Sequence, residues 1–116
     1  MTEPVETALP VGMIGAALGA RATFVQFSST FCAPCRATRL VLDRVAGTTE
    51  GVAHVELDVA DHAGLGERLG IDATPTVLIL DADGIERGRV RGVPTLAQAR
   101  AAVAAVALSA TAPQAR

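Results

Sequence analysis

The sequence predicts one small α/β domain, on three observations. The chain has 116 residues, the size of a single domain, and half of them are hydrophobic, which is enough for a core. Short apolar runs that suit strands also alternate with stretches whose apolar residues recur every three or four positions, as on helices. That alternation is typical of βαβ units, in which helices connect and cover the strands of a sheet.

The first half of the chain predicts a helix, a strand and a second helix. Residues 11–20 are apolar and follow Pro10. The face of this helix that we expect to be buried carries Met13, Ile14, Ala17 and Leu18. Residues 23–27 form an apolar run of strand type. A second helix is expected from Pro34, which suits a first turn, to Gly47. Its apolar side would carry Ala37, Leu40, Val41 and Val45, and its polar side Arg36, Arg39, Asp43 and Arg44.

The next part of the chain predicts three strands and a short helix. Residues 52–59 suit a strand, and residues 61–69 suit a short helix that two glycines weaken. Residues 76–80 form a continuous apolar run, as in a strand covered on both faces. The turn residues 81–84 lead into a last strand over 85–91, so a hairpin is expected.

The final helix begins at a capping box. Thr95 is followed three positions later by Gln98, and the two side chains are expected to satisfy each other's backbone N–H groups. The apolar stripe of this helix comprises Leu96, Ala99, Val103 and Val106. We therefore assign residues 1–108 to one domain and expect residues 109–116 to be a flexible C-terminal tail.

The two cysteines carry the strongest functional signal. Cys32 and Cys35 are the only cysteines, and the segment Cys-Ala-Pro-Cys stands between a predicted strand and a predicted helix. Such a pair serves either redox chemistry or metal binding. Structural zinc takes four ligands, and His54 and His62 are too far apart in the sequence for the usual zinc spacing. We expect a redox-active dithiol and no metal; a zinc site and a purely structural disulfide are the alternatives.

The helix that begins at the motif supports redox chemistry. The thiolate is the attacking species, so a redox-active cysteine needs a lowered thiol pKa. The unpaired N–H groups and the positive end of the helix dipole would face the sulfur of Cys32 and favour its thiolate. Cys32 is therefore predicted to be the nucleophile. Cys35 is predicted to hydrogen-bond that thiolate and later to displace it from a mixed disulfide.

Three separated segments resemble the thioredoxin family in their order and spacing. Residues 24–27 and 31–36 are similar to that family's strand followed by Trp-Cys-Gly-Pro-Cys-Lys. Residues 70–76 are similar to the segment that carries the family's cis-proline, and residues 90–92 to the glycine-bearing end of its last strand. The resemblance covers most of the chain. It implies a thioredoxin-like fold, a central mixed sheet flanked by helices, and thiol-disulfide oxidoreductase activity.

The resemblance also implies a substrate groove beside the dithiol. There the cis-proline would be Pro75, and the backbone of Thr74 would pair with an extended substrate segment while Cys32 attacks its disulfide. The groove residues implied in this way are Phe31, Ala33, Pro34, Thr74, Pro75, Gly92 and Val93. One alternative is that Thr74 and Pro75 merely begin a strand. The other is that Phe31 and Val93 are ordinary, partly buried apolar residues.

Several residues depart from the family pattern. Phe31 replaces the usual Trp and lacks its indole N–H, and Ala33 replaces Gly. Thr74 replaces a larger aliphatic residue, and threonine there is familiar from specialised relatives such as disulfide isomerases and membrane-associated thiol reductants. The protein is therefore expected either to reduce disulfides in many different proteins or to act on a single partner.

The group behind the second cysteine also departs from the family pattern. Gln26 stands where many thioredoxins bury an aspartate, and an amide carries no titrating proton. His54 stands where those proteins have a lysine, and histidine titrates close to neutral pH. We hypothesise that Gln26 orients a water or His54, and that His54 is the proton carrier for Cys35. The alternative is a strand histidine satisfied by a neighbouring carbonyl.

Charge and composition argue against a nucleic-acid partner. The formal net charge is −2, and the chain has no Trp, no Tyr and three Phe for stacking on bases. All ten basic residues are arginine, and Arg87, Arg89 and Arg91 alternate along the last predicted strand. On an edge strand such charge discourages edge-to-edge aggregation. A docking patch for an acidic partner is the alternative.

The N-terminal region bears on location. The apolar segment 11–20 is too short to span a bilayer. The residues before it contain Glu3 and Glu6 and no Lys or Arg, unlike a secretory signal. A cytoplasmic location is therefore expected, the alternative being the soluble part of an exported or membrane-anchored protein.

These patterns together predict a monomeric thioredoxin-like enzyme that reduces protein disulfides through Cys32 and Cys35. It needs no bound cofactor, and its electrons would come from a thioredoxin reductase or another dithiol protein. One alternative is a specialised reductant or isomerase that serves one partner. The other is a thioredoxin-fold binding module whose dithiol is structural or regulatory.

Overall fold

The computed structural model describes the backbone of residues 17–111 and the side chains of residues 17–106. Strands and helices alternate in it as the sequence predicts. In chain order they are β1 (Ala22–Ser28), α2 (Ala33–Thr48), β2 (Val52–Asp58), α3 (Ala63–Arg68), β3 (Thr76–Asp81), β4 (Glu86–Arg91) and α4 (Leu96–Thr111).

The four strands form one mixed sheet in the order β2-β1-β3-β4. β1 runs parallel to β2, with Ala22 opposite Val52, and antiparallel to β3. A parallel pair needs a crossover connection, which α2 provides, whereas β3 and β4 are joined by a short hairpin turn. The predicted thioredoxin-like architecture, a mixed sheet flanked by helices, is thereby confirmed.

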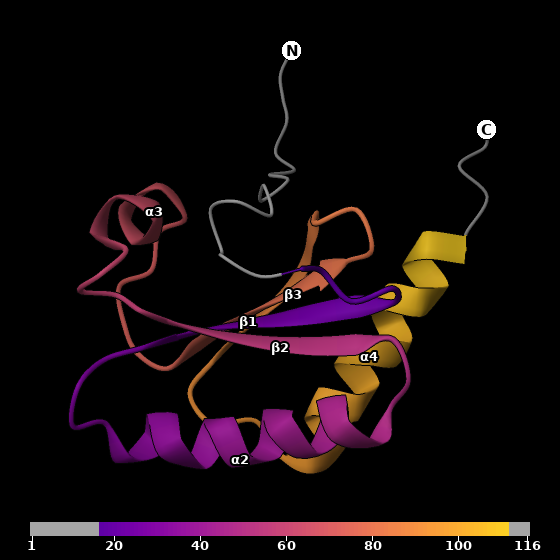
Figure 1. Cartoon of the computed structure of the whole chain (residues 1–116), viewed down its shortest axis with the longest axis horizontal. Coiled ribbons are helices and arrows are strands. Elements are labelled where there is room, and N and C mark those ends of the chain that lie inside the picture. Colours follow the sequence, from indigo (N-terminus) through magenta and orange to yellow (C-terminus); the bar gives the residue numbers. More distant parts are fainter. Residues whose placement is uncertain (1–16, 112–116) are drawn as a thin grey trace.

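Helices cover both faces of the sheet. Figure 1 shows α2 and α4 on one side of the strands and α3 on the other. Because side chains alternate along a strand, β1 contributes to both layers. Phe24 packs in a cluster with Leu42 of α2 and Val103 of α4, while Val25 packs in a second cluster with Leu65 of α3. All seven residues of β1 are buried, so this strand forms the centre of the core.

The buried face of α2 agrees with the predicted one only in part: Val45 is buried and Val41 packs against the first cluster. Leu40 was assigned to the apolar side, but its side chain is 72% exposed, and Ala37 is exposed as well. The buried residues of this helix are Cys35, Thr38, Leu42 and Val45. Their three- and four-residue spacing forms a continuous stripe that begins at the second cysteine. A pattern based on hydrophobicity alone does not reveal the whole stripe, because Cys35 and Thr38 are small and only weakly apolar or polar.

The two ends of the chain only partly test the predictions made for them. Residues 11–16 of the first predicted helix lie outside the described residues. Residues 17–20 are not helical, although Leu18 packs against the second cluster. At the other end α4 continues to Thr111, and the rest of the predicted tail lies outside the described residues. Across residues 17–111 no helix is both long enough and apolar enough to cross a membrane.

The predicted capping box at the start of α4 is present. The backbone N–H of Thr95 donates to Oε1 of Gln98 at 2.9 Å, and the N–H of Gln98 donates to Oγ1 of Thr95 at 3.0 Å. Each side chain therefore satisfies a backbone donor that would lack a partner at a helix start. The box fixes where α4 begins, just after the segment that follows β4.

The arginines of β4 lie on an edge strand of the sheet, as predicted. All three form ion pairs within the chain. The pairs are Arg87 with Asp81 at 2.9 Å, Arg89 with Glu86 at 2.8 Å, and Arg91 with Asp72 at 3.2 Å. Their charge is thus balanced locally, which favours edge protection over docking of an acidic partner.

Candidate functional site

The two cysteines form a disulfide at the start of α2. Cys32 is the N-cap residue of the helix, and its Sγ accepts a hydrogen bond from the backbone N–H of Cys35 at 3.1 Å. Pro34 stands in the first turn, where its missing N–H costs no helical hydrogen bond. Cys35 is 1% exposed, whereas Cys32 is half-buried. Cys32 is therefore the more accessible of the two to another molecule.

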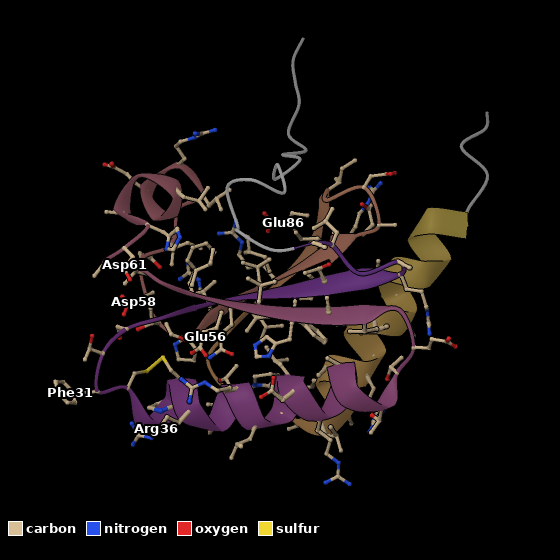
Figure 2. The ribbon with its side chains drawn as sticks, viewed as in Figure 1. Phe31, Arg36, Glu56, Asp58, Asp61 and Glu86 are labelled. Atoms are coloured by element: carbon tan, nitrogen blue, oxygen red, sulfur yellow. A yellow bond between two sulfur atoms is a disulfide. The ribbon has the colours of Figure 1, made fainter. Side chains whose placement is uncertain are left out.

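The loop before the disulfide presents an aromatic side chain to solvent. Phe31 is 97% exposed, and Figure 2 shows it pointing away from the body of the molecule beside the disulfide. Its backbone has a φ of 57°, the only positive value among the described non-glycine residues. A bulky side chain in that region costs about 1–3 kcal/mol. Phe31 is thus not the partly buried core residue of the alternative reading, whereas Val93 is 45% exposed.

Hydrogen bonds join the Thr74-Pro75 segment to two other loops. The bond between Thr74 and Pro75 is cis. The hydroxyls of Thr74 and Ser29 are 2.8 Å apart, which ties this segment to the loop before Cys32. On its other side, the N–H of Gly92 donates to the carbonyl of Pro75 at 2.9 Å. Gly92 has a φ of 84°, which glycine adopts without strain. Three segments that the sequence assigned to the groove therefore lie together.

The residues assigned to the groove differ in exposure. Ala33 and Pro34 are exposed, Thr74 and Gly92 are half-buried, and Pro75 is buried. A hollow of about 280 Å³ adjoins this segment. Its lining residues are Val59, Ile71, Asp72, Ala73 and Thr74. The surface beside the dithiol thus offers both exposed side chains and a depression.

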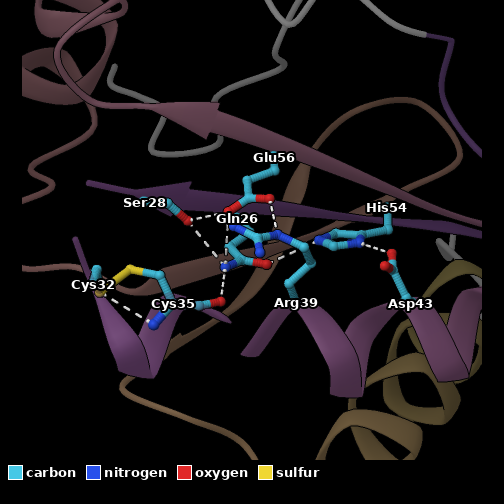
Figure 3. A network of polar contacts seen from close by, with 8 residues as sticks. All are labelled: Gln26, Ser28, Cys32, Cys35, Arg39, Asp43, His54 and Glu56. Carbon is cyan, nitrogen blue, oxygen red and sulfur yellow. Dashed lines mark hydrogen bonds and ion pairs between the residues drawn. A yellow bond between two sulfur atoms is a disulfide. The ribbon is translucent and has the colours of Figure 1, made fainter. Parts of the chain in front are cut away.

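Gln26 is the centre of a polar network behind Cys35 (Figure 3). This fully buried side chain donates from Nε2 to the carbonyl of Cys35 at 2.8 Å and to Oγ of Ser28 at 3.0 Å. Its Oε1 lies 3.0 Å from Nε2 of His54. The orientation of the amide follows from these partners, because only the NH₂ end can donate to a carbonyl oxygen. Nε2 of His54 therefore donates to Gln26.

His54 is held on both sides of its ring. Besides Gln26, it contacts Oδ1 of Asp43 through Nδ1 at 2.6 Å, and its side chain is only 6% exposed. Gln26 thus orients His54, as hypothesised. The network reaches Cys35 at its backbone carbonyl, and none of its hydrogen bonds ends on the sulfur of this disulfide form. Whether His54 carries a proton for Cys35 remains a hypothesis.

Sequence reasoning missed an ion pair in the same network. Arg39 donates from Nε to Oε1 of Glu56 at 2.6 Å and from Nη2 to Oε2 at 2.9 Å. Oγ of Ser28 donates to Oε2 of Glu56 at 2.7 Å. The hydrogen bond from Arg39 holds the pKa of Glu56 below its ordinary value, although partial burial opposes the shift. The pair raises the pKa of Arg39 in turn.

The missed carboxylate lies directly across the sheet from Gln26. In the parallel pairing of β1 with β2, Gln26 is opposite Glu56 and Phe24 is opposite His54. Only the register of two strands far apart in the sequence brings these residues together. The signals that pointed toward it were the alternation of polar residues along β2 and the arginine one turn after Cys35 in α2.

An accessible sulfur and a buried sulfur at a helix N-terminus, on a mixed sheet flanked by helices, define a thiol-disulfide centre of the Cys-x-x-Cys class. The family model described as Thioredoxin matches residues 16–108. The chain belongs to the thioredoxin family, which confirms the resemblance seen in the sequence.

The relatives support the same assignment. The chain is 35% identical over 66 residues to a thioredoxin of Echinococcus granulosus, across 57% of this chain and 61% of that protein. It is 32% identical over 69 residues to a thioredoxin of Chlamydia caviae, across 60% and 67%. The matched stretches span between 49% and 67% of the length of the curated relatives.

Solved structures share the fold. Thioredoxin f from spinach chloroplast superimposes with a TM-score of 0.65 at 25% identity, across 76% of this chain and 78% of that one. A thioredoxin from Nicotiana alata gives 0.65 at 26% identity, across 74% and 73%. A mutant thioredoxin from Halobacterium salinarum gives 0.68 at 18% identity, across 75% of both chains, and shows likeness of fold alone.

Proposed function

We propose that the protein is a thiol-disulfide oxidoreductase that reduces disulfides in other proteins. The observation that carries the proposal is the Cys32–Cys35 disulfide at the start of α2, with Cys32 accessible and Cys35 buried. An accessible thiol can attack a substrate, and a buried one next to it can resolve the product without competing for the first attack. Membership of the thioredoxin family supports the same activity.

In the reduced protein, the thiolate of Cys32 attacks one sulfur of a substrate disulfide. A mixed disulfide forms, and the other substrate sulfur leaves as a thiolate that takes up a proton. Cys35 then attacks the Sγ of Cys32, which releases the second substrate thiol and forms the Cys32–Cys35 disulfide. Two electrons have passed to the substrate. The N-terminus of α2 and the N–H of Cys35 stabilise the thiolate of Cys32.

The substrate is proposed to bind across the groove assigned from the sequence. The exposed side chains of Phe31, Ala33 and Val93 would contact it, and the backbone of Thr74, next to Pro75, would pair with it as an added strand. Gly92 borders the same surface through its hydrogen bond to Pro75. Phe31 is exposed and has a strained backbone, and neither feature stabilises the fold. Both therefore support a binding role for this loop.

Two variants test the activity on a disulfide-bonded protein substrate. Cys32→Ser removes the attacking sulfur and should abolish turnover. Cys35→Ser keeps the attack but not the resolution, so it should accumulate a mixed disulfide with the substrate, detectable as a covalent complex on a non-reducing gel. If Cys32→Ser retains turnover, the proposal fails. If the wild-type protein has no turnover, and both it and Cys32→Ser bind a partner, the protein is instead a binding module with a structural or regulatory dithiol.

We also propose that His54 supplies the proton for Cys35. Because Gln26 separates the two in the disulfide form, this role requires Gln26 to release the imidazole when the bridge opens. His54→Gln should lower the rate of disulfide reduction and change its pH profile. Glu67→Gln, an exposed substitution on α3, is the control. An unchanged rate and pH profile in His54→Gln would eliminate the proposal.

The remaining expectations complete the proposal. The protein acts as a cytoplasmic monomer, uses no bound cofactor, and receives electrons from a thioredoxin reductase or another dithiol protein. A partner-specific reductant or isomerase is a second candidate, favoured by threonine rather than a larger aliphatic residue at position 74. Comparison of turnover on several unrelated disulfide-bonded proteins distinguishes the two, because a partner-specific enzyme would reduce few of them.

A further inference from the structure

Thr38 holds the one buried side-chain polar atom, among the described residues, that has no hydrogen-bond partner. The residue lies on the inner face of α2 and is 0% exposed. Its Oγ1 has no protein partner in the disulfide form. Burying a hydroxyl without a hydrogen bond is unfavourable, so such a group calls for a physical explanation.

One usual acceptor for this hydroxyl is already occupied. A threonine inside a helix commonly donates to the carbonyl three or four residues earlier. Oγ1 of Thr38 makes no hydrogen bond to the carbonyl of Pro34, four residues earlier, and the carbonyl three residues earlier belongs to Cys35. That oxygen accepts from Nε2 of Gln26 at 2.8 Å, and the helix directs the N–H of Arg39 at it as well. Both of its lone pairs are thus in use. The polar network behind the dithiol therefore leaves Thr38 without this partner.

A further polar group within reach along the helix is the sulfur of Cys35. Residues three apart on a helix are neighbours, and helical side chains lean toward the N-terminus, so Thr38 leans toward Cys35. Both residues belong to the buried stripe of α2. In the disulfide the sulfur of Cys35 is bonded to Cys32 and takes no hydrogen bond from Thr38. In the reduced protein the sulfur of Cys35 is no longer held by the bond to Cys32. As a thiolate it also accepts a hydrogen bond far better than a disulfide sulfur does.

We propose that Thr38 is a positioning residue whose hydroxyl donates a hydrogen bond to the sulfur of Cys35 only when the dithiol is reduced. The inference rests on the proposed redox function. The two electrons come from an external dithiol, which becomes a disulfide, and its protons pass to the two cysteine sulfurs or to solvent. Thr38 neither gains nor loses a proton. Its hydroxyl is unpaired in one redox state and paired in the other, so it shifts the equilibrium toward the dithiol.

Thr38→Val tests the proposal, because it keeps the shape of the side chain and removes the hydroxyl. In this variant the disulfide form no longer contains an unpaired hydroxyl, and the dithiol form no longer contains the hydrogen bond to the sulfur of Cys35. The equilibrium constant should shift roughly tenfold toward the disulfide, which makes the reduction potential about 30 mV more negative. Thr38→Ser keeps the hydroxyl and is the matched control. It should stay within about threefold of wild type, since a lost methyl affects both forms alike.

Urea unfolding of the oxidised and the chemically reduced protein provides a second readout. Thr38→Val should stabilise the oxidised form relative to wild type and should not stabilise the reduced form. Equal changes in both forms with an unchanged potential, or a shift toward the dithiol, would overturn the proposal. If wild type shows no reversible two-electron transition, the proposed function fails. The unfolding comparison then still decides whether Thr38 responds to the state of the cysteines.

Discussion

Both polar atoms of the Gln26 side chain have hydrogen-bond partners in the core. Its two N–H groups have acceptors on Cys35 and Ser28, and its oxygen accepts from His54. Each of these contacts fixes a different element, because the partners come from α2, β1 and β2. A buried amide with satisfied partners therefore positions the backbone of Cys35 without introducing a charge. Among the charged groups of the network, Glu56 lies beside the amide, with Oε2 3.4 Å from Nε2 of Gln26, and Arg39 and Asp43 lie one step further out.

Glu56 should give the protein an acid-sensitive component of stability. Its folded pKa lies below the ordinary value, with the Arg39 hydrogen bond as the main cause. A depressed folded pKa stabilises the protein above the unfolded pKa, about 4.3, and this contribution is lost as pH falls through the lower folded value. Glu56→Gln should therefore lower the free energy of unfolding by about 1–3 kcal/mol at pH 7, with the difference from wild type shrinking below about pH 4.

Urea unfolding between pH 7 and pH 3 measures this effect. Glu67→Gln is the matched control, since Glu67 is exposed on α3 and forms no ion pair within the described residues. It should change stability little at any pH in that range. A deficit in Glu56→Gln that stays constant down to pH 3 would show that the carboxylate charge is not what stabilises the network.

Individual site residues were predicted either from a local signal or from the family resemblance. Cys32 and Cys35 are three positions apart, with two residues between them, so their spacing alone indicates the chemistry. Glu56 and Asp43 reach the site through strand register and helix rotation, which no short window of sequence contains. Gln26 and His54 were found through the family resemblance, by their position rather than by their chemistry.

At the level of elements, α2 links the active disulfide to the core. Its first turn holds both cysteines, and its buried stripe continues from Cys35 through Thr38 to Leu42 and Val45. The last two belong to the cluster shared with α4 and the sheet. Packing of the second and third turns therefore sets the rotation of the helix, and the rotation places Cys35 inward and Cys32 at the surface.

Truncation of two leucines distinguishes the buried face of α2 from the exposed one. Leu42 is 0% exposed, and Leu42→Ala should cost about 2–5 kcal/mol of unfolding free energy through lost burial and a cavity. Leu40 is 72% exposed, and Leu40→Ala should change stability by less than about 0.5 kcal/mol. Urea denaturation gives both values. Comparable losses at the two positions would mean that the helix is rotated toward the face predicted from hydrophobicity.

Element types were predictable because their signals repeat within short windows. The apolar run within β3 and the Thr95–Gln98 capping box of α4 led to the correct kind of element at the correct place. The orientation of α2 was predicted only in part: Val41 and Val45 were assigned correctly, whereas Thr38 and Cys35 are buried although they are weakly apolar or polar. Tertiary packing, and not the strongest hydrophobic residue, decided which face turned inward.

At the scale of the whole molecule, strand directions bring the site loops to one end of the sheet. β1 runs antiparallel to β3, and β3 antiparallel to β4, so the end of β1, the start of β3 and the end of β4 are adjacent. These termini lead to the disulfide, to Pro75 and to Gly92 respectively. The Ser29–Thr74 and Gly92–Pro75 hydrogen bonds confirm their contact. This topology could be expected only from the family resemblance, since periodicity does not give strand order.

The reduction potential of the Cys32–Cys35 pair shows whether its disulfide opens and closes reversibly. The protein is equilibrated in dithiothreitol or glutathione buffers of graded potential, and free thiols are trapped and counted by mass or gel shift. We predict one reversible two-electron transition, at about −270 mV, the value of thioredoxin itself, if the protein is a general reductant. A value near about −120 to −180 mV would indicate an oxidant or isomerase instead. Absence of any reversible transition would contradict the redox function and favour a binding module with a structural dithiol.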